Sequence, residues 1–361
     1  MPMKVGIVGM PNAGKSSLFS ALTGVAAEAA NYPFTTIEPN VAIVPVQDER
    51  MVQVAETVKA SKIVWDTIAF HDIAGLVAGA HKGEGLGNQF LANIRETDAL
   101  LHVVRAHTDT GIVHSEGSVD PLRDISTIET ELIYADLEQA ERRLERVVRQ
   151  ARGGDKHAIA EQGWLQQVIE ALQAGRPVRT VPVPDDAADA AQLLGSLTAK
   201  PVLFVANVDE GDVEVPAGIA EYAASQGAGA VAVSARLEAE LGALSDEEAA
   251  EMRADLGLAE SGLQTVVRGA FALLDLIAFF TAGEDKPAQT WHLRRGLTAW
   301  HAAGQIHSDI QKGFVRAEVV SWDALVQYGG YGAAREHAAL RLEGRDYVMS
   351  DGDVITVRFS P

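Results

Sequence analysis

Residues 9–16 read Gly-Met-Pro-Asn-Ala-Gly-Lys-Ser, a stretch whose residue types suit the binding of a polyphosphate. The glycines let backbone N–H groups wrap phosphate oxygens, Lys15 adds a cation at the β/γ oxygens, and Ser16 offers a hydroxyl to Mg²⁺. An apolar run, Val5–Val8, precedes the loop and a helical pattern over residues 16–23 follows it. The sequence therefore predicts a strand, a phosphate loop and a helix, with nucleotide contacts from Asn12, Ala13, Gly14, Lys15, Ser16 and Ser17.

Two further segments have the residue types of a nucleotide switch. Asp72-Ile-Ala-Gly75 follows an apolar run, and its carboxylate can hold Mg²⁺ while the Gly75 N–H senses the γ-phosphate. Between the two motifs, the loop 31–39 carries two adjacent hydroxyls, of which we choose Thr36 over Thr35 to complete the Mg²⁺ shell. The predicted metal ligands are therefore Ser16, Thr36 and Asp72.

A base-reading loop is predicted at Asn207-Val-Asp-Glu210, after the apolar run 201–206. GTPases read guanine with Asn-Lys-x-Asp, whose carboxylate accepts hydrogen bonds from guanine N1–H and the 2-amino group. Here Glu210 is one methylene longer than Asp, and Val208 replaces the lysine. Because adenine offers no such donors, we expect ATP to be favoured, with Asn207, Val208 and Glu210 at the base, joined by Ser234 and Ala235 after the next strand.

Composition limits the classes of protein to consider. The 361 residues are 47% apolar and 22% charged, as in a globular protein, and contain no cysteine, which excludes disulfides and thiolate metal sites. The net charge of −20 argues against broad capture of nucleic acid, so we expect no DNA partner. We find no membrane span or signal peptide, and expect a cytoplasmic monomer.

The order of patterns predicts an α/β fold: a P-loop G-type domain with a helical insertion and a small C-terminal domain. We expect the nucleotide-binding domain at 1–123 and 200–277, a coiled-coil arm at 124–199 and a β-grasp-like domain at 278–361. The arm has an apolar seam formed by Leu137, Ala140, Leu144, Val147 and Ala151 and, on the returning helix, by Ile159, Leu165, Val168, Ile169 and Leu172. A solvated structural arm and one that contacts a partner are both open. A helix is expected over Val266–Phe280.

Together these motifs resemble the Obg-like ATPase family, YchF type, in the Obg branch of the translation-factor-class P-loop NTPases. The resemblance covers essentially the whole chain and also includes Asn31–Asn40 and Lys82–Leu91. It implies a low-rate, Mg²⁺-dependent ATPase switch that binds ribosomes and is linked to translation or stress regulation. It also implies that the last domain is a TGS domain, and that the insertion is the coiled-coil arm of the family.

The resemblance raises the question of what activates water. Leu76 stands where small GTPases carry a water-orienting Gln, so this side chain cannot polarise water. A K⁺ ion held by Asn12 is one candidate, and His114 in the loop 111–117 is another. We therefore count Lys15, Asn12 and His114 as catalytic candidates.

Two alternative functions stay open at this point: a GTPase of the Obg branch, and a non-hydrolysing nucleotide sensor that acts as a scaffold. The ribosome partner rests on resemblance, with modest support from a nearly neutral C-terminal region. Its basic residues could form an RNA-facing patch; they are Arg294, Arg295, Lys312, Arg316, Arg341 and Arg345.

Overall fold

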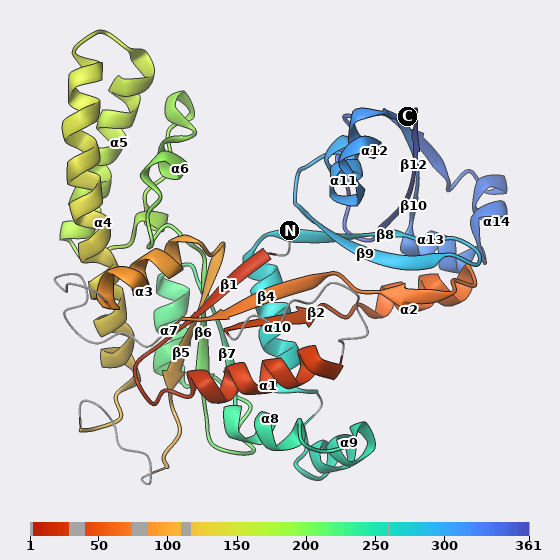
Figure 1. Ribbon diagram of the computed structural model, residues 1–361, viewed down its shortest axis with the longest axis horizontal. Coiled ribbons are helices and arrows are strands. Elements are labelled where there is room, and N and C mark those ends of the chain that lie inside the picture. Colours follow the sequence, from red (N-terminus) through yellow and green to blue (C-terminus); the bar gives the residue numbers. More distant parts are fainter. Residues whose placement is uncertain (1–2, 29–39, 74–85, 110–116, 259, 361) are drawn as a thin grey trace. The chain divides into compact units, whose positions relative to one another are not determined.

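The computed structural model of the chain describes residues 3–28, 40–73, 86–109, 117–258 and 260–360 (Figure 1). Their contacts divide the chain into two compact units, which are residues 3–44 with 69–273 and residues 45–68 with 274–361. None of the described helices is long and apolar enough to cross a membrane.

The first unit is built on a six-stranded sheet in the order β2-β4-β1-β5-β6-β7. Neighbouring strands from β1 to β7 pair in parallel, as the alternation of strands and helices predicts. The strands are β1 (Met3–Val8), β2 (Val41–Pro45), β4 (Thr67–Asp72), β5 (Ala99–Arg105), β6 (Val202–Asn207) and β7 (Gly229–Val233). Their carboxyl ends therefore bring the predicted motifs to one edge of the sheet.

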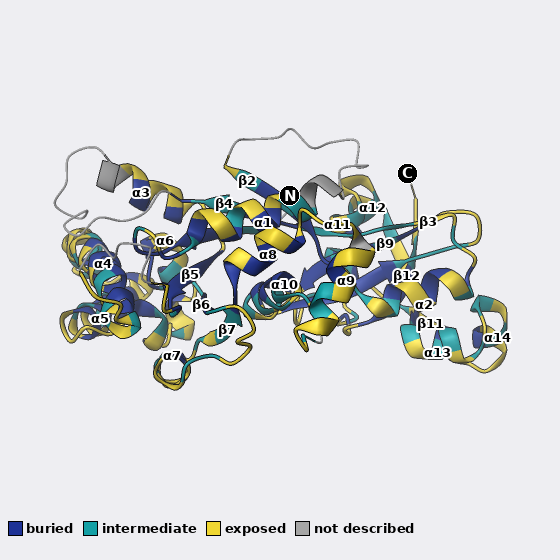
Figure 2. Ribbon diagram, turned by 90° about the horizontal axis from the view of Figure 1, so that it is seen from below, coloured by how far each residue is buried: buried dark blue, intermediate teal, exposed yellow. Residues whose placement is uncertain are grey.

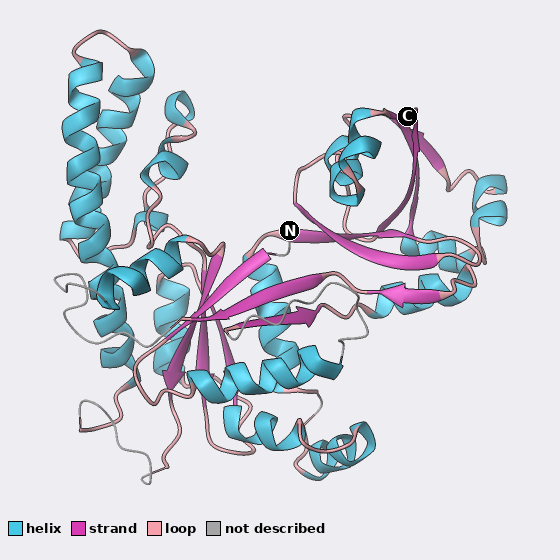
Figure 3. Cartoon of the chain, in the orientation of Figure 1, coloured by secondary structure: helices cyan, strands magenta, loops and turns pink. Residues whose placement is uncertain are grey.

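Helices cover both faces of this sheet (Figure 3). On one face α3 (Leu86–Arg95), α4 (Pro121–Ala151) and α7 (Ala217–Ser225) share a core with alternate strand residues such as Phe204. On the other face α10 (Gly262–Leu273) packs so closely that a Cβ at Gly269 would lie 2.8 Å from Leu203 Cδ2. The remaining helices are α1 (Lys15–Glu28), α8 (Ala235–Leu241) and α9 (Asp246–Asp255).

The helical insertion is present as a hairpin that projects from the sheet (Figure 1), and Figure 2 shows buried and exposed residues side by side on its two helices. Helix α4 continues into α5 (Lys156–Gln173), and the chain returns to the sheet through short segments, η2 (Val178–Thr180), η3 (Asp185–Ala187) and α6 (Ala190–Leu194). Ala140 and Val147 are fully buried in the seam, with Leu137, Leu144 and Ala151 packed against it.

One seam residue was predicted wrongly. Ile159 is 52% exposed, whereas Trp164, which we did not place in the seam, is 2% exposed. The buried face of α5 runs through Ala158, Leu165, Val168 and Leu172, so Ile159 lies one position away from it.

The helix expected over Val266–Phe280 is also wrong in its second half. Helix α10 ends at Leu273, Asp275 has a left-handed φ of 48°, and Leu276–Thr281 forms strand β8. Residues 277 and 279 point into one core and residues 278 and 280 into another, so both faces of β8 are buried. A strand buried on both faces is a continuous apolar run, which sequence periodicity cannot distinguish from a buried helix.

The second unit contains a mixed sheet in the order β11-β10-β12-β8-β9-β3. Its C-terminal elements are β8, β9 (Pro287–Arg294), α11 (Ala299–Ile306), α12 (Ser308–Lys312), β10 (Phe314–Ser321), α13 (Trp322–Gln327), α14 (Tyr331–Glu336), β11 (Arg341–Glu343) and β12 (Asp353–Phe359). The predicted terminal strand after the turn at Gly352 is thus confirmed as β12.

This unit also takes in a segment that we had assigned to the nucleotide-binding domain. Helix α2 (Glu49–Thr57) and strand β3 (Lys62–Val64) belong to it: β3 pairs in parallel with β9, and α2 buries Met51 and Val54 in the same core as Phe280. Arg50 forms ion pairs with Asp48 and Asp351, each at 2.7 Å. The boundary expected within the first 123 residues therefore has to be corrected, because the apolar face of α2 completes the C-terminal core.

Candidate nucleotide-binding site

The phosphate loop has the backbone conformation that its sequence predicts. It connects β1 to α1, and its turn uses left-handed φ angles of 62° at Asn12 and 100° at Gly14. A Cβ at Gly9 would lie 2.4 Å from the Val103 carbonyl oxygen of β5. The glycines are therefore needed for the turn and for its close approach to the neighbouring strand.

Asn207 holds the loop in place from the end of β6. Its Nδ2 donates to the Ala13 carbonyl at 3.1 Å, and its Oδ1 accepts from the Ala235 N–H at 3.0 Å. The side chain is buried, so these hydrogen bonds are shielded from water. Sequence reasoning predicts that Asn207 contacts the base; what the structure shows is that it joins the phosphate loop to the start of α8.

We predict that Gly14→Ala will weaken nucleotide binding strongly and destabilise the loop. The φ of 100° is costly for alanine, by about 1–3 kcal/mol, and a Cβ at this position would lie 2.2 Å from Asn207 Nδ2. Nucleotide titration and thermal unfolding measure the two effects. Gly163→Ala is a matched control, because this helical glycine has open space around its Cβ direction; loss of binding there too would contradict the local explanation.

Lys15 and Asp72 carry opposite charges, and burial disfavours the charged form of both side chains. Lys15 Nζ donates to the Met10 carbonyl at 2.7 Å, inside the loop. Burial lowers the pKa of the Lys15 ammonium, and nearby Asp72 only opposes this shift. Burial likewise raises the pKa of the Asp72 carboxyl, with Lys15 opposing it. A polyphosphate beside Lys15 and a divalent cation beside Asp72 would supply the missing counter-charges.

The other predicted phosphate contacts lie at the start of α1. Ser16 and Ser17 are exposed in its first turn, whereas Ala13 is buried under the loop. Asp72 ends β4, where its N–H donates to the Asn40 carbonyl at 3.0 Å. Thr36, Gly75, Leu76 and His114 lie outside the described residues, so the structure does not place them.

In the predicted base-reading loop, the acidic side chains contact other parts of the protein. Val208 is buried in the core, and its N–H donates to the Val233 carbonyl at 3.0 Å. The Asp209 carboxylate accepts from both the N–H and the hydroxyl of Thr108, each at 2.9 Å. The Thr108 hydrogen bonds hold the pKa of Asp209 below its usual value.

Glu210 is partly exposed and pairs with Arg236 Nε at 3.3 Å. Ser234 caps α8 by accepting from the Leu237 N–H at 3.4 Å, and Ala235 is buried behind it. Thr108 and Arg236 were missed by sequence reasoning. Arg236 could have been predicted, because it directly follows the predicted Ser234-Ala235 pair. No sequence motif marks Thr108, which becomes a neighbour of Asp209 only because β5 and β6 are adjacent.

Comparisons with known proteins cover both ends of the chain. Residues 4–141 match the MMR_HSR1 family, described as 50S ribosome-binding GTPase, and residues 276–360 match YchF-GTPase_C, described as a protein of unknown function (DUF933). The chain is 48% identical, over the full length of both, to a protein of Haemophilus influenzae named ribosome-binding ATPase YchF. This chain belongs to the YchF family. A Bacillus subtilis protein of the same name is 46% identical, again over both full lengths.

A solved YchF structure supports the assignment at the level of the fold. The structure of the Schizosaccharomyces pombe YchF GTPase aligns with a TM-score of 0.88 and 36% identity, covering 99% of this chain and 97% of that one. The predicted membership of the YchF type and the mixed α/β P-loop fold are thus confirmed. The names of the relatives disagree on the nucleotide, since the bacterial proteins are called ATPases and the yeast protein a GTPase.

Proposed function

We propose that this chain is a cytoplasmic, monomeric ATPase that binds ribosomes and acts as a nucleotide-dependent switch. The observation that carries the proposal is the phosphate loop, closed by Asn207 and containing the buried Lys15. Full-length identity to proteins named ribosome-binding ATPase supports the ribosome as partner. A C-terminal TGS domain is part of the proposal, and the second unit is compatible with it.

Mg²⁺ is the metal that P-loop nucleotide hydrolases use in general. The residues fit it: Ser16 and Asp72 offer the hard oxygen donors that Mg²⁺ prefers, and partial burial raises the pKa of the Asp72 carboxyl, a shift that a bound cation would oppose. We assign Thr36 as the third ligand. When bound, Mg²⁺ neutralises the charge that develops on the β- and γ-phosphate oxygens. The chain itself contributes Lys15 as the fixed cation and the backbone N–H groups of residues 12–17.

The choice of ATP over GTP rests on the acidic side chains after β6. A guanine reader needs a carboxylate that is available to two base N–H groups. Here Thr108 donates two hydrogen bonds to Asp209 Oδ2, and the exposed Glu210 carboxylate pairs with Arg236, so a guanine would have to compete with both partners. The second N–H of the Asn207 amide remains suited to donate to N7 of the base, an acceptor that adenine and guanine share, so this contact keeps affinity for ATP without selecting between the two.

We therefore expect ATP to bind more tightly than GTP, by about 1–3 kcal/mol for each polar contact that guanine cannot form. Titration of both nucleotides with the Mg²⁺-loaded protein measures the difference. GTP binding more than about tenfold tighter than ATP binding would favour the alternative function, a GTPase. The matched G-domain family is itself described as a GTPase, which is why this alternative is tested.

Activation of the attacking water is proposed to depend on K⁺ at Asn12 and on His114. Asn12 is exposed in the loop with a left-handed φ of 62°, which turns the chain where a cation would sit beside the β/γ bridge. We expect both His114→Ala and replacement of K⁺ by Na⁺ to lower the hydrolysis rate, by about 10- to 100-fold where the group contributes. Rates unchanged in both experiments would contradict this account.

A non-hydrolysing nucleotide sensor is the alternative from a different class. Leu76 favours it, because this residue cannot orient water, but Lys15, Ser16 and Asp72 would then serve no catalytic purpose. A turnover assay with and without ribosomes separates the two functions.

A further inference from the structure

Arg236 lies at the start of α8, beside the predicted base-reading loop. The residue before it, Ala235, donates its N–H to Asn207 Oδ1 at 3.0 Å, and the Nδ2 of the same amide holds the phosphate loop. Strands β6 and β7 end side by side, with Asn207 opposite Val233. The backbone of Arg236 therefore begins one residue away from the amide that is suited to contact the base.

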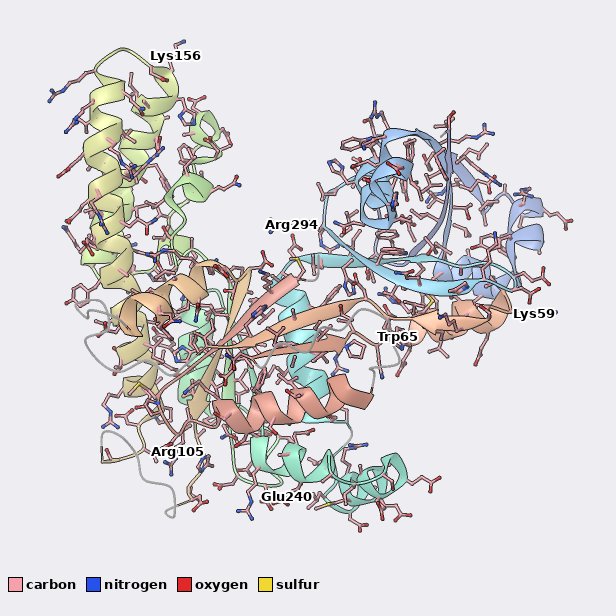
Figure 4. All side chains as sticks on the ribbon, viewed as in Figure 1. Lys59, Trp65, Arg105, Lys156, Glu240 and Arg294 are labelled. Atoms are coloured by element: carbon pink, nitrogen blue, oxygen red, sulfur yellow. The ribbon has the colours of Figure 1, made fainter. Side chains whose placement is uncertain are left out.

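Two carboxylates hold the Arg236 side chain toward the end of the base-reading loop. Its Nε lies 3.3 Å from Glu210 Oε1, the last residue of that loop, and 3.1 Å from Glu240 Oε1 on α8 (Figure 4). The hydrogen bond to Glu240 and the nearby charges of Glu210 and Asp109 raise the pKa of Arg236. The guanidinium is thus charged and is held both by the loop and by the helix.

These contacts leave the flat faces of the guanidinium open. Carboxylates pair with the N–H groups along its edge, whereas aromatic rings stack on its face. Arg50 lies over the Phe280 ring at 5.6 Å, and Arg345 lies over the Trp300 ring at 5.5 Å. In the part of the chain that the structure describes, no aromatic ring covers Arg236, whose side chain is 72% exposed. A planar ring from a ligand can therefore reach it.

The base-reading loop itself supplies no cation that could cover a base. Residues 207–210 are Asn-Val-Asp-Glu, so the lysine that flanks the base in Asn-Lys-x-Asp proteins is absent. Val208 takes its place and is buried, with its N–H bonded to the Val233 carbonyl. A cation over the base has to come from outside the loop, and Arg236 is held at the end of it.

We propose that the Arg236 guanidinium stacks on the face of the bound purine, and that Glu210 positions Arg236 instead of contacting the base. Guanidinium planes stack on nucleobases, and a cation over an aromatic ring is attracted by its π electrons. Adenine and guanine both offer such a face, so the contact adds affinity for either and leaves the choice between them to polar groups. The inference rests on the proposed function in one respect, that a purine nucleotide occupies this site.

The test measures how much the base adds to binding. Affinities for ATP and for inorganic triphosphate, which has no base, are measured with Mg²⁺, and the ratio of the two cancels charge effects that act on the phosphates. The variants are Arg236→Ala, Glu210→Ala and the two combined. The control is Arg142→Ala, because Arg142 is 66% exposed and, like Arg236, pairs with a glutamate four positions away. Thermal unfolding verifies that each variant is folded.

We expect Arg236→Ala to reduce the ratio of ATP to triphosphate affinity by about 3- to 30-fold, the range of a cation–π contact. In hydrolysis the KM for ATP should rise while kcat stays within about twofold, because the base is held equally in the ground state and the transition state. Arg142→Ala should leave the ratio unchanged. An unchanged ratio in Arg236→Ala would overturn the proposal. A higher ratio would also overturn it, because Arg236 would then obstruct the base.

The role of Glu210 is tested by combining the two substitutions. Alone, Glu210→Ala should reduce the ratio by about two- to fivefold, as expected for an exposed ion pair. Added to Arg236→Ala, it should have almost no further effect, because Glu210 acts through the arginine. An equal reduction in both backgrounds would assign Glu210 to the base itself and overturn its positioning role.

The proposed function and the Arg236 contact can fail separately. Tighter binding of GTP than of ATP, with both weakened by Arg236→Ala, would contradict the preference for ATP and support the contact. Hydrolysis of ATP with a KM that Arg236→Ala leaves unchanged would keep the ATPase and overturn the contact.

Discussion

Lys15→Met will abolish most ATP hydrolysis, lowering the rate by about 10²- to 10³-fold, without unfolding the protein. The loss follows from the position of Lys15, which is buried in the phosphate loop with its Nζ 2.7 Å from the Met10 carbonyl oxygen. In the nucleotide complex this cation is expected to stabilise the charge at the β/γ oxygens. Phosphate release measures the rate, with Lys312→Met, an exposed lysine, as the control.

The stability of the Lys15→Met variant shows whether its loss of activity comes from the missing cation or from unfolding of the protein. Burial lowers the pKa of Lys15, so the folded protein binds this proton less tightly than the unfolded chain does. The charged Lys15 therefore lowers the free energy of unfolding. This destabilisation is fully present below the folded-state pKa and disappears as the pH rises past the unfolded-state pKa of about 10.4. At neutral pH, the substitution Lys15→Met should therefore leave the free energy of unfolding unchanged or raise it. A variant that is inactive because it unfolds would contradict this explanation.

Met51→Ala will destabilise the C-terminal unit by about 2–5 kcal/mol, although Met51 lies far from that region in the sequence. The side chain is completely buried in the core shared with Phe280, Val320 and Leu325. Val52→Ala on the same helix is the matched control, since Val52 is 38% exposed and should change stability by less than about 0.5 kcal/mol. Denaturant unfolding followed by tryptophan fluorescence measures both.

The same packing predicts that residues 274–361 do not fold alone. Without α2 and β3, the fragment lacks an edge strand of its sheet and exposes the core that Met51 and Val54 cover. A fragment with a cooperative unfolding transition and the stability of the whole unit would contradict the division of the chain into these two units.

This division also bears on how a switch could work. The segment 45–68 lies in the sequence between the predicted Mg²⁺ ligands Thr36 and Asp72, yet it belongs to the C-terminal unit. Asp66 is tied to that unit, because its carboxylate accepts from the His292 N–H at 3.0 Å, and six residues later β4 ends at Asp72. Strand β4 therefore links Asp72, a predicted Mg²⁺ ligand, covalently to the segment that belongs to the C-terminal unit.

The elements that sequence predicted best are those whose chemistry is local. The phosphate loop and its flanking strand and helix follow from the glycines, Lys15 and the apolar run before them. The arm follows from apolar residues at alternating spacings of three and four between Leu137 and Ala151, the seam of a coiled coil. By contrast, the predicted seam residue Ile159 is exposed, and Trp164, which was not predicted, is buried. A shift of one residue along α5 is enough to move a side chain from the buried to the exposed face.

The features that sequence did not predict depend on partners distant in the chain. Asn207 joins the phosphate loop to α8 across 194 and 28 residues, and its amide gives no sign of this in the sequence. Helix α2 has an ordinary amphipathic pattern, which shows that it covers a core but not which one. The pairing of Asp209 with Thr108 likewise appears only once β5 and β6 are adjacent.

The measurement that tests the central claim most directly is steady-state phosphate release from ATP and from GTP, with Mg²⁺ and K⁺, in the presence and absence of purified ribosomes. The account predicts slow hydrolysis of ATP by the protein alone, a clear increase on addition of ribosomes, and a lower rate with GTP in both conditions. Preferential hydrolysis of GTP, or no turnover of ATP with ribosomes bound, would contradict it.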